Sequence, residues 1–385
     1  MFLRSVFFAI FFQIFSCTLS TDELVGTVIV FRHGARVPRL FHPNDPYQNM
    51  SFWPVPIGEL TEEGKQQAYE LGQWARQNYA GFLPEKYASK DFFVYSSGIG
   101  RTLMSASLFA AGLYPSISTS NLPFQPIPIH SKPPQMDNTI LSDQPCPRRE
   151  YILENILNST YFKKIDEDNK EVYKYLSDHM GMSITSFKGL NAYYDTFFIE
   201  KHNNLTLPEW TKKVYPEKLR ELAIYNLVFR TYNTDSSRLR IGSMYSEILA
   251  YLTSFTGKPN EFKSDFGRGK KGRKMMAISG HDINIADLLG VLKFPLDFWP
   301  SYSSTVIFEL KKRNNDDFYV SVFYKNTTGI TNVNIKGCGS KCELSKFIQY
   351  VEPIVMDPKD WKHQCVLDKK YVYHIEDEPK ISRYI

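Results

Sequence analysis

Long apolar runs are scarce in this sequence of 385 residues. After residue 20, no stretch approaches the about 18 consecutive apolar residues that a membrane-spanning helix requires, and the C-terminal run I-E-D-E-P-K-I-S-R-Y-I is polar. We therefore expect no membrane anchor. Low-complexity tracts and internal repeats are missing as well, and a content of 43% hydrophobic and 23% charged residues indicates a globular protein with one large or two ordinary domains.

Motifs of metal-dependent and nucleotide-dependent enzymes are likewise absent. The sequence has no H-E-x-x-H pair, no P-loop and no D-x-D cluster next to an apolar strand, so we expect neither a metal nor another cofactor. The densest basic run, residues 268–274, is interleaved with glycines and lacks aromatic side chains. A nucleic-acid or heparin patch would suit these charges, but a solvated loop fits the composition better, and we expect no nucleic-acid partner.

The first 20 residues differ from the rest of the chain. Arg4 precedes an apolar run over residues 6–15, and small residues follow that run. This pattern predicts a secretory signal peptide over residues 1–20, and therefore a secreted, extracellular protein. N-x-[ST] sequons fit a surface glycoprotein, and the expected glycosylation sites are Asn49, Asn158, Asn204 and Asn326.

Cysteine is sparse, at five residues, and Cys17 lies inside the predicted signal peptide. The others are Cys146, Cys338, Cys342 and Cys365. An even number in an exported protein indicates two disulfides, with three connectivities open. We favour a bridge within the C-G-S-K-C segment, because Gly339 lets it turn tightly, and hence a second bridge between the first and the last of the four. A zinc site formed by Cys338, Cys342, His363 and Cys365 is the less favoured alternative in an oxidising compartment.

One stretch, residues 25–39, combines an apolar strand pattern with a cluster of charges. It reads V-G-T-V-I-V-F-R-H-G-A-R-V-P-R, and its run V-I-V-F is typical of a strand buried on both faces of a parallel sheet. The strand ends at Arg32 and His33, where ligands bind in open α/β sheets. Arg36 adds a second guanidinium, and Gly34 permits an unusual backbone bend. Because a histidine merely buried in a core would not need two arginines beside it, the stretch favours a site for a tetrahedral oxyanion.

Two further segments repeat this arrangement. Residues 92–95 have a strand pattern followed by S-S-G-I-G-R-T, which places Arg101 at a strand-to-helix junction where free backbone N–H groups favour anions. The run K-M-M-A-I-S-G predicts another buried strand, which ends at His281 and Asp282 before helical spacing in residues 283–292. Each segment alone is weak, since an arginine at a helix start is often merely exposed and an aspartate often caps a helix.

Together these segments resemble the signature of the histidine acid phosphatases, a branch of the histidine phosphatase superfamily. The resemblance is carried by R-H-G-A-R-V-P, by L-T-x-x-G at residues 60–64 and by S-G-H-D, and it extends over most of the chain past residue 24. It implies a covalent phosphohistidine mechanism, with His33 as the nucleophile and Asp282 as the proton donor. The phosphate-binding residues that it implies are Arg32, Arg36, Arg101 and His281. It also implies the disulfide pairing favoured above, and homodimers occur in this family, so a homodimer is a further expectation.

The expected fold is α/β, with a phosphoglycerate-mutase-like core of a mostly parallel sheet and flanking helices, interrupted by an inserted, mainly α-helical cap domain. The chain from about residue 115 to residue 240 is first Pro-rich and then helical and aromatic-rich, without buried-strand runs. We assign residues 21–135 and 241–385 to the core and residues 136–240 to the cap, which would roof the pocket. A strand pair is expected at 306–310 and 319–324.

The predicted function is a secreted acid phosphatase, a phosphoric monoester hydrolase of class EC 3.1.3.2, with an acidic optimum and a small phosphomonoester or phosphoprotein substrate. In its R-H-G-A-R-V-P form and its D-P-Y loop, the sequence resembles secreted insect venom acid phosphatases more than lysosomal relatives. The sequence departs from the family at Gly98 and Gly100, one or both of which are usually acidic, so Arg101 would be less firmly oriented. Two alternatives stay open: a catalytically weak or inactive binding protein or venom component, and a phytase-like phosphatase.

Overall fold

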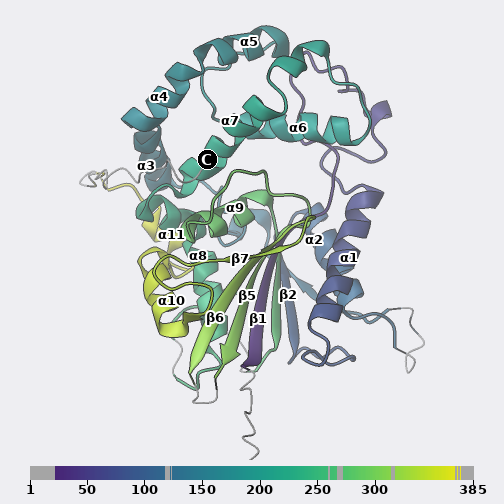
Figure 1. The fold of residues 1–385 in the computed structure, drawn as a ribbon, viewed down its shortest axis with the longest axis vertical. Helices are drawn as coiled ribbons and strands as arrows, with labels where there is room; N and C mark the ends of the chain where they lie inside the picture. The colour runs from purple at the N-terminus through teal and green to yellow at the C-terminus, as the bar shows by residue number, and fades with distance from the viewer. Residues whose placement is uncertain are drawn as a thin grey trace, which may run out of the picture.

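The computed structural model describes residues 22–117, 122, 124–258, 261–266, 272–313, 317–368, 371 and 373. The predicted signal peptide lies outside the described residues, as does most of the basic run at 268–274. A mixed sheet forms the centre of the molecule, with helices on both faces and a further group of helices beyond one end of the strands (Figure 1). This architecture confirms the expected α/β class.

The sheet divides into a parallel half and an antiparallel half. Its strand order is β3-β2-β4-β1-β5-β6-β7, with β8 paired to β6. The mutually parallel strands are β1 (Glu23–Arg32), β2 (Phe92–Ser96), β3 (Ile129–His130) and β4 (Met275–Gly280). The antiparallel strands are β5 (Thr305–Lys312), β6 (Phe318–Lys325), β7 (Ile330–Val333) and β8 (Cys342–Glu343). β5 and β6 are the strand pair that the sequence predicts, so the sheet is parallel on the side that carries the predicted site and antiparallel beyond β1.

Alternate side chains of β1 pack against helices on opposite faces of the sheet. The covering helices are α1 (Glu62–Asn78) and α2 (Gly100–Leu113) on one face, and α8 (Thr234–Thr253), α9 (Asp282–Val291) and α10 (Leu344–Val351) on the other. Ile29 and Phe31 share a buried cluster with α1 and α2, whereas Val28 and Val30 share one with α8, α9 and α10. Burial on both faces explains why the strand reads as a continuous apolar run.

The helices of the inserted segment arch over the carboxyl ends of the parallel strands (Figure 1). They are α3 (Pro147–Leu157), α4 (Thr160–Asp168), α5 (Lys170–Met180), α6 (Leu190–His202) and α7 (Glu217–Val228). Aromatic and aliphatic side chains such as Phe162, Leu176 and Leu222 give them a buried cluster of their own, which Trp361 of the short helix α11 (Trp361–Gln364) joins. The assignment of residues 136–240 to a separate domain stays a prediction.

Both favoured disulfides are present. Cys146 at the start of α3 is bonded to Cys365, and Cys338 is bonded to Cys342. The zinc alternative therefore does not form, because three of its four ligands are bridged. Among the helices that the structure describes, none is both long and apolar enough to cross a bilayer.

The predicted glycosylation sites all reach the surface. Asn49, Asn158 and Asn204 are exposed, and Asn326, next to the turn between β6 and β7, is partly exposed. An attached glycan would therefore meet no packed interior at these positions. Glycosylation itself stays a prediction.

Candidate active site

Three neighbouring parallel strands bring the predicted residues together. β2, β4 and β1 lie side by side, and Arg32 at the end of β1 is in register with Gly280 at the end of β4. His33 and His281 follow directly, and their ring centroids are 5.5 Å apart. Arg101 lies in the first turn of α2, which comes after β2. The candidate site thus occupies the carboxyl edge of the parallel half of the sheet.

Backbone contacts hold the loop after β1 against the start of α1. Thr61 caps α1: its hydroxyl accepts a hydrogen bond from the Gly64 N–H at 3.1 Å, and its own N–H donates to the Ala35 carbonyl at 3.0 Å. A Cβ added to Gly34 would collide with the Gly64 carbonyl oxygen. The unusual bend expected at Gly34 is wrong, since its φ is not positive. Glycine is required there because two backbones approach closely.

His33 presents one ring nitrogen as a nucleophile. Its Nδ1 lies 2.8 Å from the Gly34 carbonyl oxygen. Because a carbonyl oxygen only accepts, this hydrogen bond places the proton on Nδ1 and leaves the lone pair on Nε2. Burial, followed by the positive charges of Arg101 and Arg32, holds the pKa of His33 well below its ordinary value of 6.5. Burial and these charges therefore favour the neutral ring over the protonated one.

Arg32 and Arg36 share one buried carboxylate, that of Asp195 on α6. Its Oδ1 accepts from Arg32 Nη2 at 3.2 Å, and its Oδ2 accepts from Arg36 Nη2 at 2.6 Å. Arg32 also donates from Nη1 to the Pro300 carbonyl at 2.5 Å, and its Cζ lies 4.2 Å from the centre of the Tyr302 ring. These contacts fix both guanidinium planes. No motif in the sequence indicates Asp195, which lies in the helical segment.

Asp282 and His281 enter the site from the start of α9. Asp282 Oδ2 lies 3.1 Å from Arg32 Nη2. Burial raises the pKa of the Asp282 carboxyl, but the charges of Arg32 and Arg36 outweigh burial and the net shift is downward. His281 Nε2 lies 3.1 Å from the Ser97 hydroxyl, and burial is the main cause that lowers the pKa of His281 to about 3. The second histidine is therefore also neutral at pH values well above 3.

Arg101 enters the same cavity from a different direction. Burial, and then the charge of Arg36, lowers the pKa of Arg101 to about 10, so the side chain stays charged. A Cβ at Gly98 would collide with the Lys132 carbonyl, whereas a Cβ at Gly100 would meet nothing within 4 Å. An acidic residue is thus incompatible with this backbone at position 98 and fits at position 100. Across the described part of the chain, no carboxylate forms an ion pair with Arg101.

The site is a cavity of about 270 Å³ between the strand ends and the inserted helices. Five of the six predicted residues line it, and four of these are His33, Arg101, His281 and Asp282. Arg36 also lines it, whereas Arg32 does not and reaches the site through Asp195 and Asp282. Lining residues that the sequence reasoning missed are Arg39, Asp143, Asn191, Asp195, Arg230 and Trp299. Except for Arg39, the last residue of the stretch 25–39, they come from segments that carry no motif, so only the fold brings them here.

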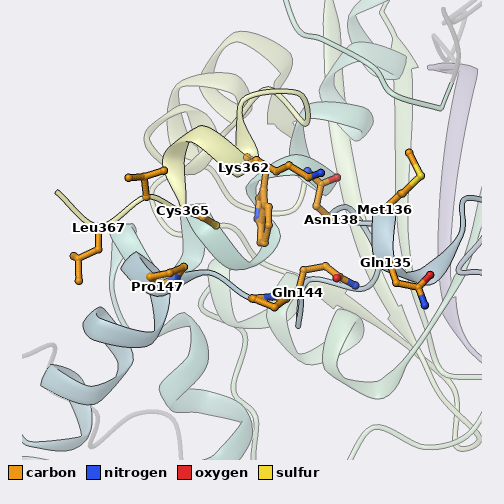
Figure 2. A pocket seen from close by; sticks show the side chains of 11 residues that line it. Gln135, Met136, Asn138, Gln144, Pro147, Lys362, Cys365 and Leu367 are labelled. Atoms are coloured by element: carbon orange, nitrogen blue, oxygen red, sulfur yellow. The ribbon is translucent and has the colours of Figure 1, made fainter.

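A larger cavity, of about 550 Å³, lies beside the Cys146–Cys365 bridge (Figure 2). Its lining includes the apolar side chains of Met136, Pro147 and Leu367, and Lys362 is the one charged side chain among its lining residues. None of the predicted catalytic or phosphate-binding residues reaches it. The chemistry indicated by the sequence therefore belongs to the smaller cavity.

A neutral imidazole with a free lone pair lies among guanidinium groups at the carboxyl edge of the sheet, which is the arrangement that the sequence predicts for a phosphate site. Residues 23–325 match the model of the histidine phosphatase superfamily (branch 2). The chain belongs to this family, as the resemblance of its motifs implies. The roles of the individual residues stay predictions.

Curated relatives of the chain are acid phosphatases. Prostatic acid phosphatase of Bos taurus is 33% identical over 356 residues, which cover 90% of this chain and 88% of the relative. Lysosomal acid phosphatase of Xenopus laevis is 32% identical over 357 residues, which cover 89% and 79%. Among solved structures, the apo form of Hafnia alvei phytase has a TM-score of 0.67 at 18% identity, covering 90% of this chain and 99% of that one. The phytase of Citrobacter braakii has a TM-score of 0.66 at 17% identity, covering 90% and 100%. The structural likeness shows the fold.

Proposed function

We propose that the chain is a secreted acid phosphatase that hydrolyses phosphate monoesters through a covalent phosphohistidine. His33 Nε2 attacks phosphorus and forms an N–P bond while the bond from phosphorus to the alcohol oxygen breaks, and Asp282 donates a proton to that oxygen. Water then attacks phosphorus, its proton passes to the Asp282 carboxylate, and the N–P bond breaks. Inorganic phosphate leaves, and both residues return to their starting states.

The cavity supplies charge where the transition state needs it. Arg36 and Arg101 line the cavity, and Arg32 adds positive charge from behind it. Their guanidinium groups would stabilise the nonbridging oxygens of the transferred phosphoryl group. His281, neutral in acid, would act there as a hydrogen-bonding group rather than as a cation.

One observation carries the proposal, the 2.8 Å hydrogen bond between His33 Nδ1 and the Gly34 carbonyl. It gives the attacking nitrogen its lone pair before substrate arrives, and the lowered pKa of His33 preserves that lone pair at low pH. Acid phosphatases as relatives over most of the chain support the same activity.

An acidic optimum follows from the requirement that the Asp282 carboxyl be protonated when it acts as the proton donor. Arg32 and Arg36 hold the pKa of Asp282 down, and a phosphate bound among these guanidinium groups would offset their charge and raise that pKa. Asp282 would therefore be protonated most readily with substrate bound and in acid. His33 remains unprotonated in the same range, so the two requirements are compatible.

Export is part of the proposal. The predicted signal peptide, the two disulfides and the surface sequons support a secreted glycoprotein, and the resemblance to insect venom acid phosphatases supports a venom-type secreted enzyme. We propose a small phosphomonoester or phosphoprotein as substrate, no cofactor and no nucleic-acid partner. A homodimer, as found in the family, is proposed as the assembly.

Hydrolysis of p-nitrophenyl phosphate from about pH 3 to 8, a range that spans the ordinary Asp and His pKa values, tests the proposal. The wild type, His33→Ala and a control, His179→Ala, are compared with a chelator present. His179 lies on α5, where its Nδ1 contacts the Tyr175 carbonyl, away from the cavity. We expect chelator-resistant activity that peaks in acid in the wild type and the control and is lost in His33→Ala. Activity that survives in His33→Ala would contradict the mechanism, and folded but inactive wild type would favour the inactive binding protein.

A second candidate is a phytase-like activity on polyphosphorylated substrates, which two side chains at the cavity favour. Arg39 and Arg230 both line it, and Arg39 is exposed and has no carboxylate partner in the described ranges. A second phosphate on the leaving group would meet this positive charge. Phosphate release from inositol hexakisphosphate tests it: Arg39→Gln should lose more activity on that substrate than on p-nitrophenyl phosphate. Equal losses of activity on the two substrates would contradict the phytase-like function and support only the hydrolysis of simple monoesters.

A further inference from the structure

Asp195 joins the inserted helices to the loop that carries the predicted nucleophile. It lies on α6, 163 residues from Arg32 and 159 from Arg36 along the chain. Each carboxylate oxygen accepts from a different guanidinium, at 3.2 Å and 2.6 Å. Asp195 is only 4% exposed, so water competes little for these hydrogen bonds.

Two buried cations beside each other need a shared counter-charge. Without Asp195, the guanidinium groups of Arg32 and Arg36 would repel each other in a region of low dielectric constant. Arg32 would keep Asp282 as a partner, whereas Arg36 would keep, among the described residues, only its hydrogen bond to the Val37 carbonyl, 3.1 Å from its Nη1. Asp195 is therefore the group that fixes the spacing of the two arginines.

We propose that Asp195 is a positioning residue for the phosphate, acting through Arg32 and Arg36. The proposal rests on the phosphatase function proposed above. It assigns to a helix of the inserted segment a part in preparing the phosphate site, in addition to covering it. The guanidinium groups would then be oriented before substrate arrives, which is the condition for electrostatic stabilisation of a transition state.

The charge of Asp195 also bears on the protonation of the site. The charged and titratable groups that face it are Arg32 and Arg36 from the end of β1 and its loop, Asp282 from α9, and Tyr302 from the loop before β5. Its negative charge partly offsets the two arginines. Replacing it by a neutral group would let the arginines lower the pKa values of both His33 and Asp282 further. Both limbs of the pH–activity profile would then move to lower pH.

The test compares Asp195→Asn, Asp195→Glu and a matched control, Asp166→Asn, on p-nitrophenyl phosphate. Asp166 lies on α4 and accepts from the Tyr173 hydroxyl at 2.8 Å, outside the cavity. For Asp195→Asn we expect kcat/KM to fall about 10- to 100-fold, as when a residue that orients a metal ligand is lost, with the optimum shifted to lower pH. Asp195→Glu keeps the charge but moves it, so its kcat should fall while the optimum stays. Asp166→Asn should keep the wild-type rate and optimum.

A double-mutant cycle separates positioning from a general structural role. If Asp195 acts through Arg36, then Asp195→Asn should cost much less activity in an Arg36→Gln background than in the wild type. Additive losses, or an unchanged pH optimum in folded Asp195→Asn, would overturn the inference while leaving the phosphatase function intact. An inactive wild type would instead overturn the proposed function. If Asp195→Asn does not fold, Asp195→Glu decides, and a wild-type kcat in that variant would overturn the inference.

Discussion

Gly34 and Gly64 pack backbone against backbone. A Cβ on Gly34 would collide with the Gly64 carbonyl, and a Cβ on Gly64 would collide with the Ala35 carbonyl. The loop that carries His33 therefore packs directly against the first turn of α1, with no side chain between the two backbones. The two short motifs R-H-G and L-T-x-x-G, far apart in sequence, are thus the two sides of one contact.

Gly64→Ala should therefore misplace the nucleophile. The methyl group forces the loop away from α1, and a shift of about 1 Å is expected to lower kcat/KM about 100-fold. Overpacking of this kind should also lower the free energy of unfolding by about 1–3 kcal/mol. Kinetics on p-nitrophenyl phosphate and urea unfolding measure the two effects.

Gly100→Ala is the matched control for that variant. A Cβ there meets nothing within 4 Å, and Gly100 is the first residue of α2, where alanine is favoured over glycine in a helix. We expect unchanged kinetics and equal or higher stability. Equal losses in the two variants would show that the close approach is not what glycine provides at position 64.

The location of the site could be predicted from sequence because its residues follow apolar strand runs directly. His33 and His281 are each one residue past a strand, and parallel strands end at the same edge of a sheet. Such a signal is local, so it needs no knowledge of the fold. The signal for the strand pair β5–β6 is equally local, since a polar turn separates two apolar runs.

Asp195 and the other lining residues could not be predicted in this way. Asp195 acts across 163 and 159 residues of sequence, and nothing around it in the chain marks it as different from an aspartate on a helix surface. The role of Gly34 was misjudged for a related reason, because its neighbour Gly64 is close in space and not in sequence. Long-range contacts of single side chains leave no periodic or compositional trace.

The two disulfides should differ greatly in their effect on stability. The Cys146–Cys365 bridge joins residues 219 apart in sequence, and the Cys338–Cys342 bridge joins residues 4 apart. In the chain-entropy account, the longer loop restricts the unfolded chain more, by on the order of 3 kcal/mol. The paired alanine variants of each bridge, compared by urea unfolding, should show the larger loss for the first. Equal losses would contradict this account.

Asp282→Asn should reveal the proton donor through the leaving group. An asparagine fills the same space but has no acidic proton, so kcat for an alkyl phosphate should fall about 10²- to 10⁴-fold. The loss should be smaller for p-nitrophenyl phosphate, whose leaving group is stable as an anion. Rates on the two substrates at the wild-type optimum test this. A loss of equal size on both would assign Asp282 a role in binding and not in proton transfer.

Glu200 should make the protein less stable as pH rises. It lies on α6 and is fully buried, and burial, followed by the charge of Asp45, raises its pKa to about 9. In the unfolded chain a glutamate has a pKa of about 4.3. Between these two values the folded protein holds a proton that the unfolded chain has released. The stability contributed by the protonated carboxyl is therefore fully present below pH about 4 and is lost progressively toward pH 9, by at most about 1.4 kcal/mol per pH unit.

Glu200→Gln isolates this effect, because glutamine has nearly the same shape and does not titrate. Urea unfolding of the wild type between pH 5 and 8 should show a free energy of unfolding that falls with pH, and the variant should show a flatter dependence over the same range. The exposed Glu70 of α1 provides the control, and Glu70→Gln should keep the wild-type slope. If Glu200→Gln kept that slope as well, the carboxyl would have to be ionised in the folded protein at pH 5, against its burial. A flatter slope would instead mean that this helix, which also carries Asp195, is held in place best under the acidic conditions in which the proposed enzyme works.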